Sequence, residues 1–370
     1  MKYVLIGSYL FFFCLLAAFS YLFIDVNIPS YHWLYSGFAT GNRTITSFLF
    51  LIFISALFII YGIVFTKKVT AWWLVGIPCV VLLFAYPAML SFDIFNYLAT
   101  AKVLFYYTEN PYLIMPIAFV GDPMLLYTHA ANKVALYGPI WILLTGIPYV
   151  IGMGNLFVTL ISFKLVVIVC YLLTLYLLWL FTKQRLPVLL FALNPLVLIE
   201  VLLSGHNDIV MMCFALGALY FVKKKRFVFA LMLFVVSILI KYATLFLIPV
   251  LVYLLYQSYR KKEIVWDHVF FFSACSMFLI FLLSPIREEM YPWYAVWFLP
   301  FVFLLPKKKV LISFAIAFSF GLLLRYLPFM YTGSHSGMTP LLRILLACAP
   351  VMCVGLYVGV KKWTASLHKQ

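Results

Sequence analysis

The segment ITSFLFLIFISALFIIYGIVFT, residues 45–66, carries no charged side chain and is followed directly by Lys67 and Lys68. A helix needs about 20 apolar residues to cross the hydrocarbon core of a bilayer, so this segment predicts a membrane-spanning helix. Similar apolar runs recur along the chain, in which 67% of residues are hydrophobic and 10% are charged. Because the runs lack the alternation of barrel strands, the expected fold class is an all-α integral membrane protein.

Clusters of lysine and arginine predict the orientation of these helices, because basic residues gather in cytoplasmic loops. We place inside, together with Lys2, the clusters Lys67-Lys68, Lys183 with Arg185, Lys223 to Arg226, Arg260 to Lys262, Lys307 to Lys309 and Lys361-Lys362. About twelve crossings result, with both ends inside. The expected spans are residues 3–24, 45–66, 70–90, 157–181, 187–204, 207–222, 227–240, 243–257, 267–286, 292–306, 310–330 and 340–360.

One apolar stretch, Leu136 to Gly152, does not fit this topology, because its crossing would move every later basic cluster outside. It contains Gly138-Pro139, a pair that interrupts helices, so we interpret it as a re-entrant or interfacial segment. The chain otherwise reads as one polytopic membrane domain, 1–370, with a large extracytoplasmic loop at 91–135. The net charge of +16 is explained by basic residues in cytoplasmic loops, which set the orientation of the spans, and does not indicate nucleic-acid binding.

Isolated charges near the outer face are the first functional indication. Glu200 lies inside a span near its outer end, and charge within a span is costly enough to suggest function. Lone cations gather at the same level: Lys164, Lys241, Arg325, Arg343 and, in an outer loop, Arg287. Any one of them could simply snorkel to the interface. Together they favour an anionic ligand, with phosphate the natural candidate.

The outer loop begins with a motif that fits a capped helix. Ser91 can cap it, and Asp93 then lies in the first turn, where a carboxylate suits the positive helix end. Asp93 and Tyr97 share a face, and the proline of Asn110-Pro111-Tyr112 ends the helix. A capped interfacial helix without chemistry explains the same pattern.

Three further motifs interrupt apolar runs, and each also has a structural explanation. Tyr137-Gly138-Pro139 is either a break beside a polar cavity or an ordinary turn. Lys241-Tyr242 places a cation within a long apolar run. In Pro292-Trp293-Tyr294 the aromatic rings suit either the membrane interface or stacking on a sugar.

A turn on the outer side carries the densest set of polar groups. Asn194-Pro195 and Glu200 precede Gly205-His206-Asn207-Asp208. Asn207 or Asp208 can cap the next helix, whereas Glu200 within a span requires a partner. His206 and Asp208 leave a divalent metal open, but no paired-ligand motif supports one, so no metal ligand or cofactor is assigned.

In this order the motifs resemble the GT-C superfamily of glycosyltransferases over roughly residues 85–300. They are most similar to polyprenyl-phosphate-mannose-dependent mannosyltransferases of bacterial cell envelopes. The resemblance implies transfer of mannose or another hexose from a polyprenyl-phosphate donor to a glycan or glycolipid at the extracytoplasmic face of a bacterial cell membrane. It assigns catalysis to Asp93. Lys241, Arg325, Arg343 and Arg287 would bind the donor phosphate. Substrate binding would fall to Tyr97, Asn110, Tyr112, Tyr137, Glu200, His206, Asn207, Asp208, Tyr242, Trp293 and Tyr294.

Two other classes of function remain open from the residues alone. A twelve-span secondary transporter would place coupling charges near the midplane and show internal repeats, whereas here the charges lie near the outer face and no repeat stands out. A protein that only binds or flips a lipid-linked sugar, or acts as a scaffold, would not require Asp93.

Overall fold

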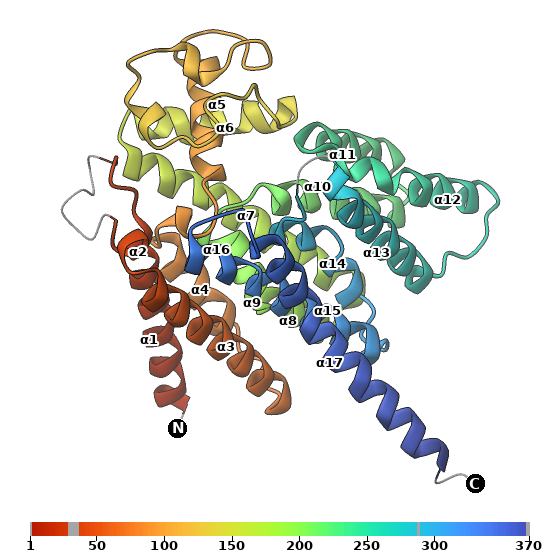
Figure 1. The fold of residues 1–370 in the computed structure, drawn as a ribbon. Coiled ribbons are helices and arrows are strands. Elements are labelled where there is room, and N and C mark those ends of the chain that lie inside the picture. The colour runs from red at the N-terminus through yellow and green to blue at the C-terminus, as the bar shows by residue number, and fades with distance from the viewer. Residues whose placement is uncertain (1, 29–36, 287–288, 368–370) are drawn as a thin grey trace. The chain divides into compact units, whose positions relative to one another are not determined.

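The protein is described by a computed structural model that covers residues 2–28, 37–286 and 289–367. Within these ranges the chain forms helices and no strands (Figure 1). The helices are α1 (Lys2–Ser20), α2 (Phe38–Gly41), α3 (Arg43–Thr66), α4 (Trp73–Leu83), α5 (Asp93–Phe105), α6 (Pro139–Gly152), α7 (Leu156–Thr182), α8 (Arg185–Ala192), α9 (Pro195–Val197), α10 (Asp208–Lys223), α11 (Phe227–Ile240), α12 (Ile248–Tyr259), α13 (Trp266–Leu283), α14 (Leu299–Phe303), α15 (Lys309–Leu324), α16 (Tyr326–Thr332) and α17 (Thr339–Leu367). A π-helical turn, Leu198–Leu203, continues α9. Turns of 3-10 helix occur at Tyr21–Phe23, Pro87–Met89, Pro116–Ala118, Pro123–Leu126, Tyr242–Leu247, Ser284–Ile286 and Pro292–Trp297.

Seven helical segments in the described part of the chain are long and apolar enough to span a membrane. They are Tyr3–Phe23, Arg43–Thr66, Leu156–Thr182, Tyr242–Tyr259, Trp266–Ile286, Lys309–Thr332 and Thr339–Lys362. An eighth results if the pair Arg185–Ala192 and Pro195–Leu203, bent by 53°, counts as one broken span. The prediction of a helical, multi-pass membrane protein is therefore confirmed, but twelve crossings are not shown.

Several of the expected spans are too short or too interrupted to count as spanning helices. The expected span 70–90 is divided between α4, with 11 residues, and the 3-10 turn Pro87–Met89. The expected span 292–306 is divided between a 3-10 turn and α14. Helix α6 has 14 residues, or about 21 Å at 1.5 Å per residue, whereas the hydrocarbon core is about 30 Å thick. That length suits the re-entrant or interfacial segment expected at Leu136 to Gly152, which stays a prediction.

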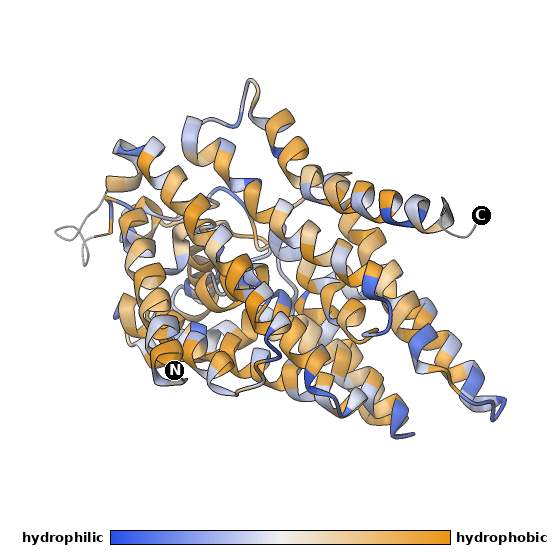
Figure 2. Cartoon of the chain, turned by 90° about the horizontal axis from the view of Figure 1, so that it is seen from below, coloured by the Kyte–Doolittle hydropathy of each residue, from blue (hydrophilic) through white to orange (hydrophobic). Residues whose placement is uncertain are grey.

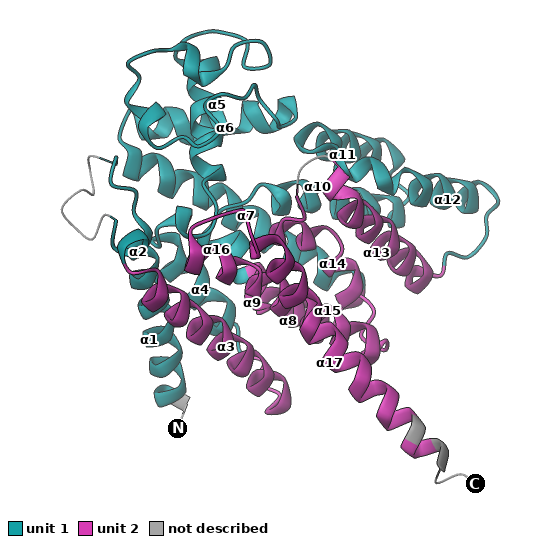
Figure 3. Cartoon of the chain, viewed as in Figure 1, with its two compact units in different colours: residues 1–41, 71–181, 198–264 teal, residues 42–70, 182–197, 265–370 magenta. Residues whose placement is uncertain are grey.

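The chain divides into two compact units (Figure 3). Unit 1 contains residues 1–41, 71–181 and 198–264, and unit 2 contains residues 42–70, 182–197 and 265–370. In unit 1, α10 packs along α11, α5 packs on α6, and α1 packs on α4. In unit 2, α15 packs along α17, and α3 packs on α16.

Hydrophobic residues cover most of the helical surface, and hydrophilic residues gather at helix ends and connections (Figure 2). Large apolar side chains of α17, among them Leu345, Met352 and Leu356, are more than half exposed, as expected for a helix that faces lipid. By contrast, every residue from 187 to 213 is buried. This buried stretch contains the polar turn with Glu200, His206, Asn207 and Asp208.

Candidate active site

Asp93 is the first residue of α5, as the sequence pattern predicts. Its backbone N–H donates a hydrogen bond to the Ser91 Oγ atom at 3.2 Å. The residue at the cap position is Phe92, and no side chain caps the helix there, so the expected cap at Ser91 is not formed. The Asp93 side chain is half-buried. On the same face, the Tyr97 side chain is fully buried, with its ring packed edge-on against Tyr137 and Trp141 at centroid distances of 4.8 and 5.1 Å.

The turn between the π-helical segment and α10 is a buried polar cluster. The His206 Nδ1 atom lies 2.9 Å from the Glu200 carbonyl oxygen and 3.2 Å from the Glu200 Oε2 atom. His206 thus provides the partner that Glu200 requires. Neither polar atom of the fully buried Asn207 amide group has a hydrogen-bond partner among the described residues. The backbone N–H of Asn207 donates a long hydrogen bond, 3.5 Å, to the Tyr97 hydroxyl.

Helix ends carry the charges of this site. Asp93 and Asp208 are the first residues of α5 and α10, where a carboxylate interacts favourably with the positive end of the helix. Lys241 directly follows the last residue of α11, where a cation suits the negative end. The Lys241 Nζ atom lies 2.8 Å from the Asp208 Oδ1 atom, and Asp208 is completely buried. The site therefore contains a buried ion pair close to the half-buried Asp93.

The electrostatic environment changes the protonation of Asp93 and His206. Burial raises the pKa of the Asp93 carboxyl above its usual value, and Asp208 adds to the rise, whereas His206 and Lys241 oppose it. Burial alone would lower the pKa of the His206 imidazole, but Glu200, Asp93 and Asp208 together raise it. A carboxyl group with a raised pKa is a stronger base once it is ionised, which suits proton transfer.

A glycine allows α6 to approach this cluster closely. Gly138 donates its backbone N–H to the Ile240 carbonyl oxygen at 3.1 Å. A Cβ atom at position 138 would lie 2.1 Å from the Leu239 carbonyl oxygen, so only glycine fits without a backbone shift. The Tyr137-Gly138-Pro139 motif thus joins the start of α6 to the end of α11, next to Lys241.

The outer loop after α5 is held by its own hydrogen bonds. The Tyr112 hydroxyl donates to the Tyr137 carbonyl oxygen at 2.8 Å, and the Asn110 side chain accepts from the Tyr112 backbone N–H. The Asp122 carboxylate accepts from the Lys102 Nζ atom at 2.7 Å and from the Tyr107 hydroxyl at 2.9 Å. Burial tends to raise the pKa of Asp122, but these bonds hold it below its usual value. The sequence pattern did not single out this anchor.

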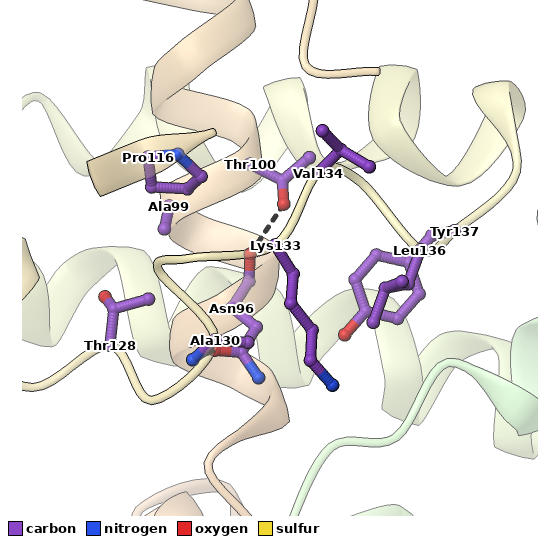
Figure 4. Close-up of a pocket in the computed structure, with 10 residues that line it drawn as sticks. All are labelled: Asn96, Ala99, Thr100, Pro116, Thr128, Ala130, Lys133, Val134, Leu136 and Tyr137. Atoms are coloured by element: carbon purple, nitrogen blue, oxygen red, sulfur yellow. Dashed lines mark hydrogen bonds between the residues drawn. The ribbon is translucent and has the colours of Figure 1, made fainter. Parts of the chain in front are cut away.

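A small pocket borders α5 one helical turn beyond Asp93 (Figure 4). Asn96 and Thr100 line it from the helix, and Thr128, Lys133 and Tyr137 line it from the loop. The Thr100 hydroxyl donates to the Asn96 carbonyl oxygen at 2.8 Å. Polar groups of the helix and of the outer loop therefore face the same space.

The other expected phosphate ligands lie in unit 2 and in part outside the described residues. The Arg325 Nη2 and Arg343 Nη1 atoms lie 2.9 and 2.8 Å from the same Glu289 Oε1 atom. One carboxylate thus offsets one of two arginine charges. The His335 ring adjoins Arg343 at 3.2 Å. Arg287 lies outside the described residues.

The structure also shows the surroundings of four other residues that the sequence analysis singled out: Lys164, Trp293, Tyr294 and Tyr242. Lys164, one of the lone cations, is buried and donates to the carbonyl oxygens of Leu82 and Ala85 near the end of α4. Trp293 is buried and stacks on Tyr291, whereas Tyr294 stacks on Trp297. Tyr242 is exposed beside Lys241. Among the described residues, no group of three or more histidine, cysteine, aspartate or glutamate side chains is placed to hold a metal ion.

Comparison with protein families identifies the chemistry. The model of the MptA/B family, described as the N-terminal domain of an alpha-(1->6)-mannopyranosyltransferase, matches residues 31–257, more than half of the chain. The chain belongs to this family. No curated protein and no solved structure matches it.

Membership in the MptA/B family makes the protein a membrane α-(1→6)-mannosyltransferase. The resemblance to GT-C mannosyltransferases is therefore confirmed, and the transporter and scaffold interpretations are replaced. The matched region includes Asp93, the 204–208 turn and Lys241, but it ends before Glu289, Arg325 and Arg343. Within unit 1, the structure brings together most of the expected residues from this region, whereas the roles of the individual side chains remain predictions.

Proposed function

We propose that this mannosyltransferase takes mannose from a polyprenyl-phosphate donor and transfers it to a hydroxyl group of a glycan or glycolipid. We place the active site at the extracytoplasmic face of a bacterial cell membrane. One observation carries the proposal: α5 begins with Asp93 beside a buried cluster that contains His206, the Asp208–Lys241 ion pair and the Asn207 amide, which has no hydrogen-bond partner in the described part of the chain.

In the proposed reaction, Asp93 acts as the general base in a single displacement. The acceptor oxygen forms a bond to C1 of the mannosyl group, and its proton passes to the Asp93 carboxylate. The bond between C1 and the phosphate oxygen breaks, and polyprenyl phosphate leaves with the electron pair. General-base groups typically contribute about 10²–10⁴-fold to a rate.

Cations would stabilise the charge that develops on the leaving phosphate. We assign Lys241, Arg325, Arg343 and Arg287 to this role. The Lys241–Asp208 and Arg325–Glu289–Arg343 contacts support pre-orientation, because a side chain already held by a carboxylate loses less freedom when the phosphate binds.

Groups around Asp93 would hold the sugars. A buried amide without a partner is costly, typically about 1–3 kcal/mol, and sugar hydroxyl groups would offset that cost at Asn207. Aromatic rings and further polar groups would contribute additional contacts. We assign to substrate binding Tyr97, Asn110, Tyr112, Tyr137, Glu200, His206, Asp208, Tyr242, Trp293 and Tyr294.

The decisive assay supplies purified protein with radiolabelled polyprenyl-phosphate mannose and a short α-mannoside acceptor, and the linkage of the product is determined. We expect α-(1→6)-linked product from the lipid donor and none from a nucleotide-linked mannose. Transfer from the nucleotide sugar in the absence of any polyprenyl phosphate would overturn the proposed donor.

A further inference from the structure

Two arginines of unit 2 that we assign to the donor phosphate meet at one carboxylate (Figure 3). Arg325 directly follows α15, Arg343 lies near the start of α17, and Glu289 precedes the 3-10 turn Pro292–Trp297. The Glu289 Oε1 atom accepts from Arg325 Nη2 at 2.9 Å and from Arg343 Nη1 at 2.8 Å. The arginine side chains are 7% and 13% exposed, whereas that of Glu289 is 39% exposed. Two mostly buried cations therefore share one partly exposed anion.

The neighbouring His335 adds no charge to this cluster. Its Nδ1 atom lies 3.2 Å from the Arg343 Nη2 atom. A guanidinium nitrogen can only donate, so the imidazole nitrogen must accept and is unprotonated. The ring also stacks on Phe329 at a centroid distance of 4.1 Å. Among the described residues, the charges that meet at Glu289 are thus two arginines and one carboxylate, which leaves a single surplus positive charge.

The donor and the product of the proposed reaction carry different charges on their phosphate groups. In the polyprenyl-phosphate donor the phosphate joins the lipid to mannose, so it is a diester with one negative charge. Transfer breaks the bond to mannose and leaves a phosphomonoester, whose second pKa is about 6 and whose charge at pH 7 is about −1.5 to −2. The single surplus positive charge of the cluster therefore matches the donor, and the charge of the product exceeds it.

We propose that Glu289 makes the arginine pair selective for the singly charged phosphodiester over the doubly charged phosphomonoester. This inference rests on the proposed lipid donor and on the binding of its phosphate at Arg325 and Arg343. Two arginines alone would hold the monoester more tightly, because the attraction grows with the charge of the ligand. The carboxylate places a like charge beside the second negative charge of the product, and such repulsion disfavours the wrong ligand. The product would then leave the site readily and make room for the next donor.

Two probes with the same lipid chain test the selectivity in the unaltered enzyme. Farnesyl phosphate is a monoester, and farnesyl methyl phosphate is a diester with one charge. We would measure the inhibition constant of each against the lipid donor, for the full-length protein in detergent at about pH 8, above the second phosphate pKa of about 6. We expect the methyl diester to bind at least as tightly as the monoester. Arginines normally bind a more highly charged phosphate better, so a clear preference of the wild type for the monoester would overturn the proposal.

Three variants show whether the charge of Glu289 is responsible. Glu289→Gln keeps an oxygen that can accept from both arginines but removes the charge, and Glu289→Ala removes both. Glu263→Gln is the matched control, because it removes the same charge from an exposed side chain between α12 and α13. In Glu289→Gln, the inhibition constant of the monoester should fall about tenfold relative to that of the diester. Glu289→Ala should shift the preference in the same direction, and Glu263→Gln should keep the wild-type preference.

A carboxylate that only braces the arginines predicts a different pattern. Glu289→Gln would then resemble wild type, and Glu289→Ala would weaken the binding of both probes alike; that result would contradict the proposal. Arg343→Ala tests the underlying assignment separately. If neither inhibition constant changes in Arg343→Ala, the arginine pair does not bind the lipid phosphate. If both constants rise in Arg343→Ala while Glu289→Gln keeps the wild-type preference, only the selectivity role of Glu289 fails.

Discussion

Replacing Lys241 with methionine should leave Asp208 as a buried carboxylate whose charge is no longer offset by the lysine. Asp208 is completely buried, and its Oδ1 atom lies 2.8 Å from the Lys241 Nζ atom. Breaking a buried ion pair by removing one partner typically costs about 3–5 kcal/mol. Since 20% of the Lys241 side chain is exposed, water screens part of the attraction. We therefore expect a loss of about 3 kcal/mol in the free energy of unfolding.

A double variant tests whether this loss comes from the pair itself. With Asp208→Asn added to Lys241→Met, neither member of this pair carries a charge, and most of the stability should return. Donor use should not return, because the lysine would also bind the donor phosphate. Unfolding free energies in detergent and KM values for the lipid donor measure the two effects. If Lys241→Met is as stable as wild type, or the double variant is no more stable than the single one, the reasoning is refuted.

The remaining predictions concern the proposed base, an arginine proposed to bind the donor phosphate, the close packing at Gly138 and the membrane topology. Asp93→Asn should lower turnover at least about a hundredfold at near-normal thermal stability, and a folded, active variant would contradict this. In the wild-type profile of activity against pH, the acid limb should lie above the usual aspartate pKa, because burial raises the pKa of this carboxyl. Arg343→Ala should raise the KM for the donor far more than that for the acceptor, with partial rescue by Arg343→Lys, which keeps the charge but loses the planar fork. Gly138→Ala should destabilise the protein, because the new Cβ would meet a backbone carbonyl at 2.1 Å; an unfolding midpoint equal to that of wild type would argue against the close approach. Single cysteines at Gly154 and Gln184, which flank the candidate span Leu156–Thr182, should label from opposite sides, with only position 154 open to outside reagents.

The sequence alone predicted most of the polar residues that cluster in unit 1, because charged residues are rare in apolar runs. Asp93 does begin a helix, as expected, although Phe92 and not Ser91 occupies the cap position. His206, Asp208 and Lys241 each interrupt or end a hydrophobic run, where a polar group requires a specific reason. Their order along the chain also matches the family, so the sequence carried both signals.

The interaction partners of these residues could not be predicted, because a sequence pattern shows where charged residues lie along the chain but not which groups they contact. Lys164 looked like a ligand for an anion, yet it donates to the Leu82 and Ala85 carbonyl oxygens. Arg325 and Arg343 share the Glu289 carboxylate. A lysine or arginine in a sequence looks the same whether it binds a phosphate, a carboxylate or a helix end. Only the geometry separates these cases.

Counting spans failed for a related reason, since hydropathy averages over a window and does not detect a break in a helix. The expected span 187–204 is mostly apolar, but the chain bends by 53° between Arg185–Ala192 and Pro195–Leu203. Proline at position 195 has no backbone N–H to donate. The Asn194 side-chain oxygen accepts from the Leu196 backbone N–H, which satisfies a donor at the start of the second segment. Composition alone therefore predicts one straight helix where the chain forms a bent pair of helices.

The breaks and the site have a common physical cause. A helix that ends at membrane depth exposes backbone N–H or C=O groups that lipid cannot satisfy, so each end needs polar or charged groups nearby. In unit 1 the ends of α5, α10 and α11 meet this need with Asp93, Asp208 and Lys241. In the proposed mechanism, the same groups would supply the base and one of the cations. Two of the helices that were expected to be crossings, α10 and α11, thus bring Asp208 and Lys241 to the candidate active site, whereas α5 comes from the expected outer loop.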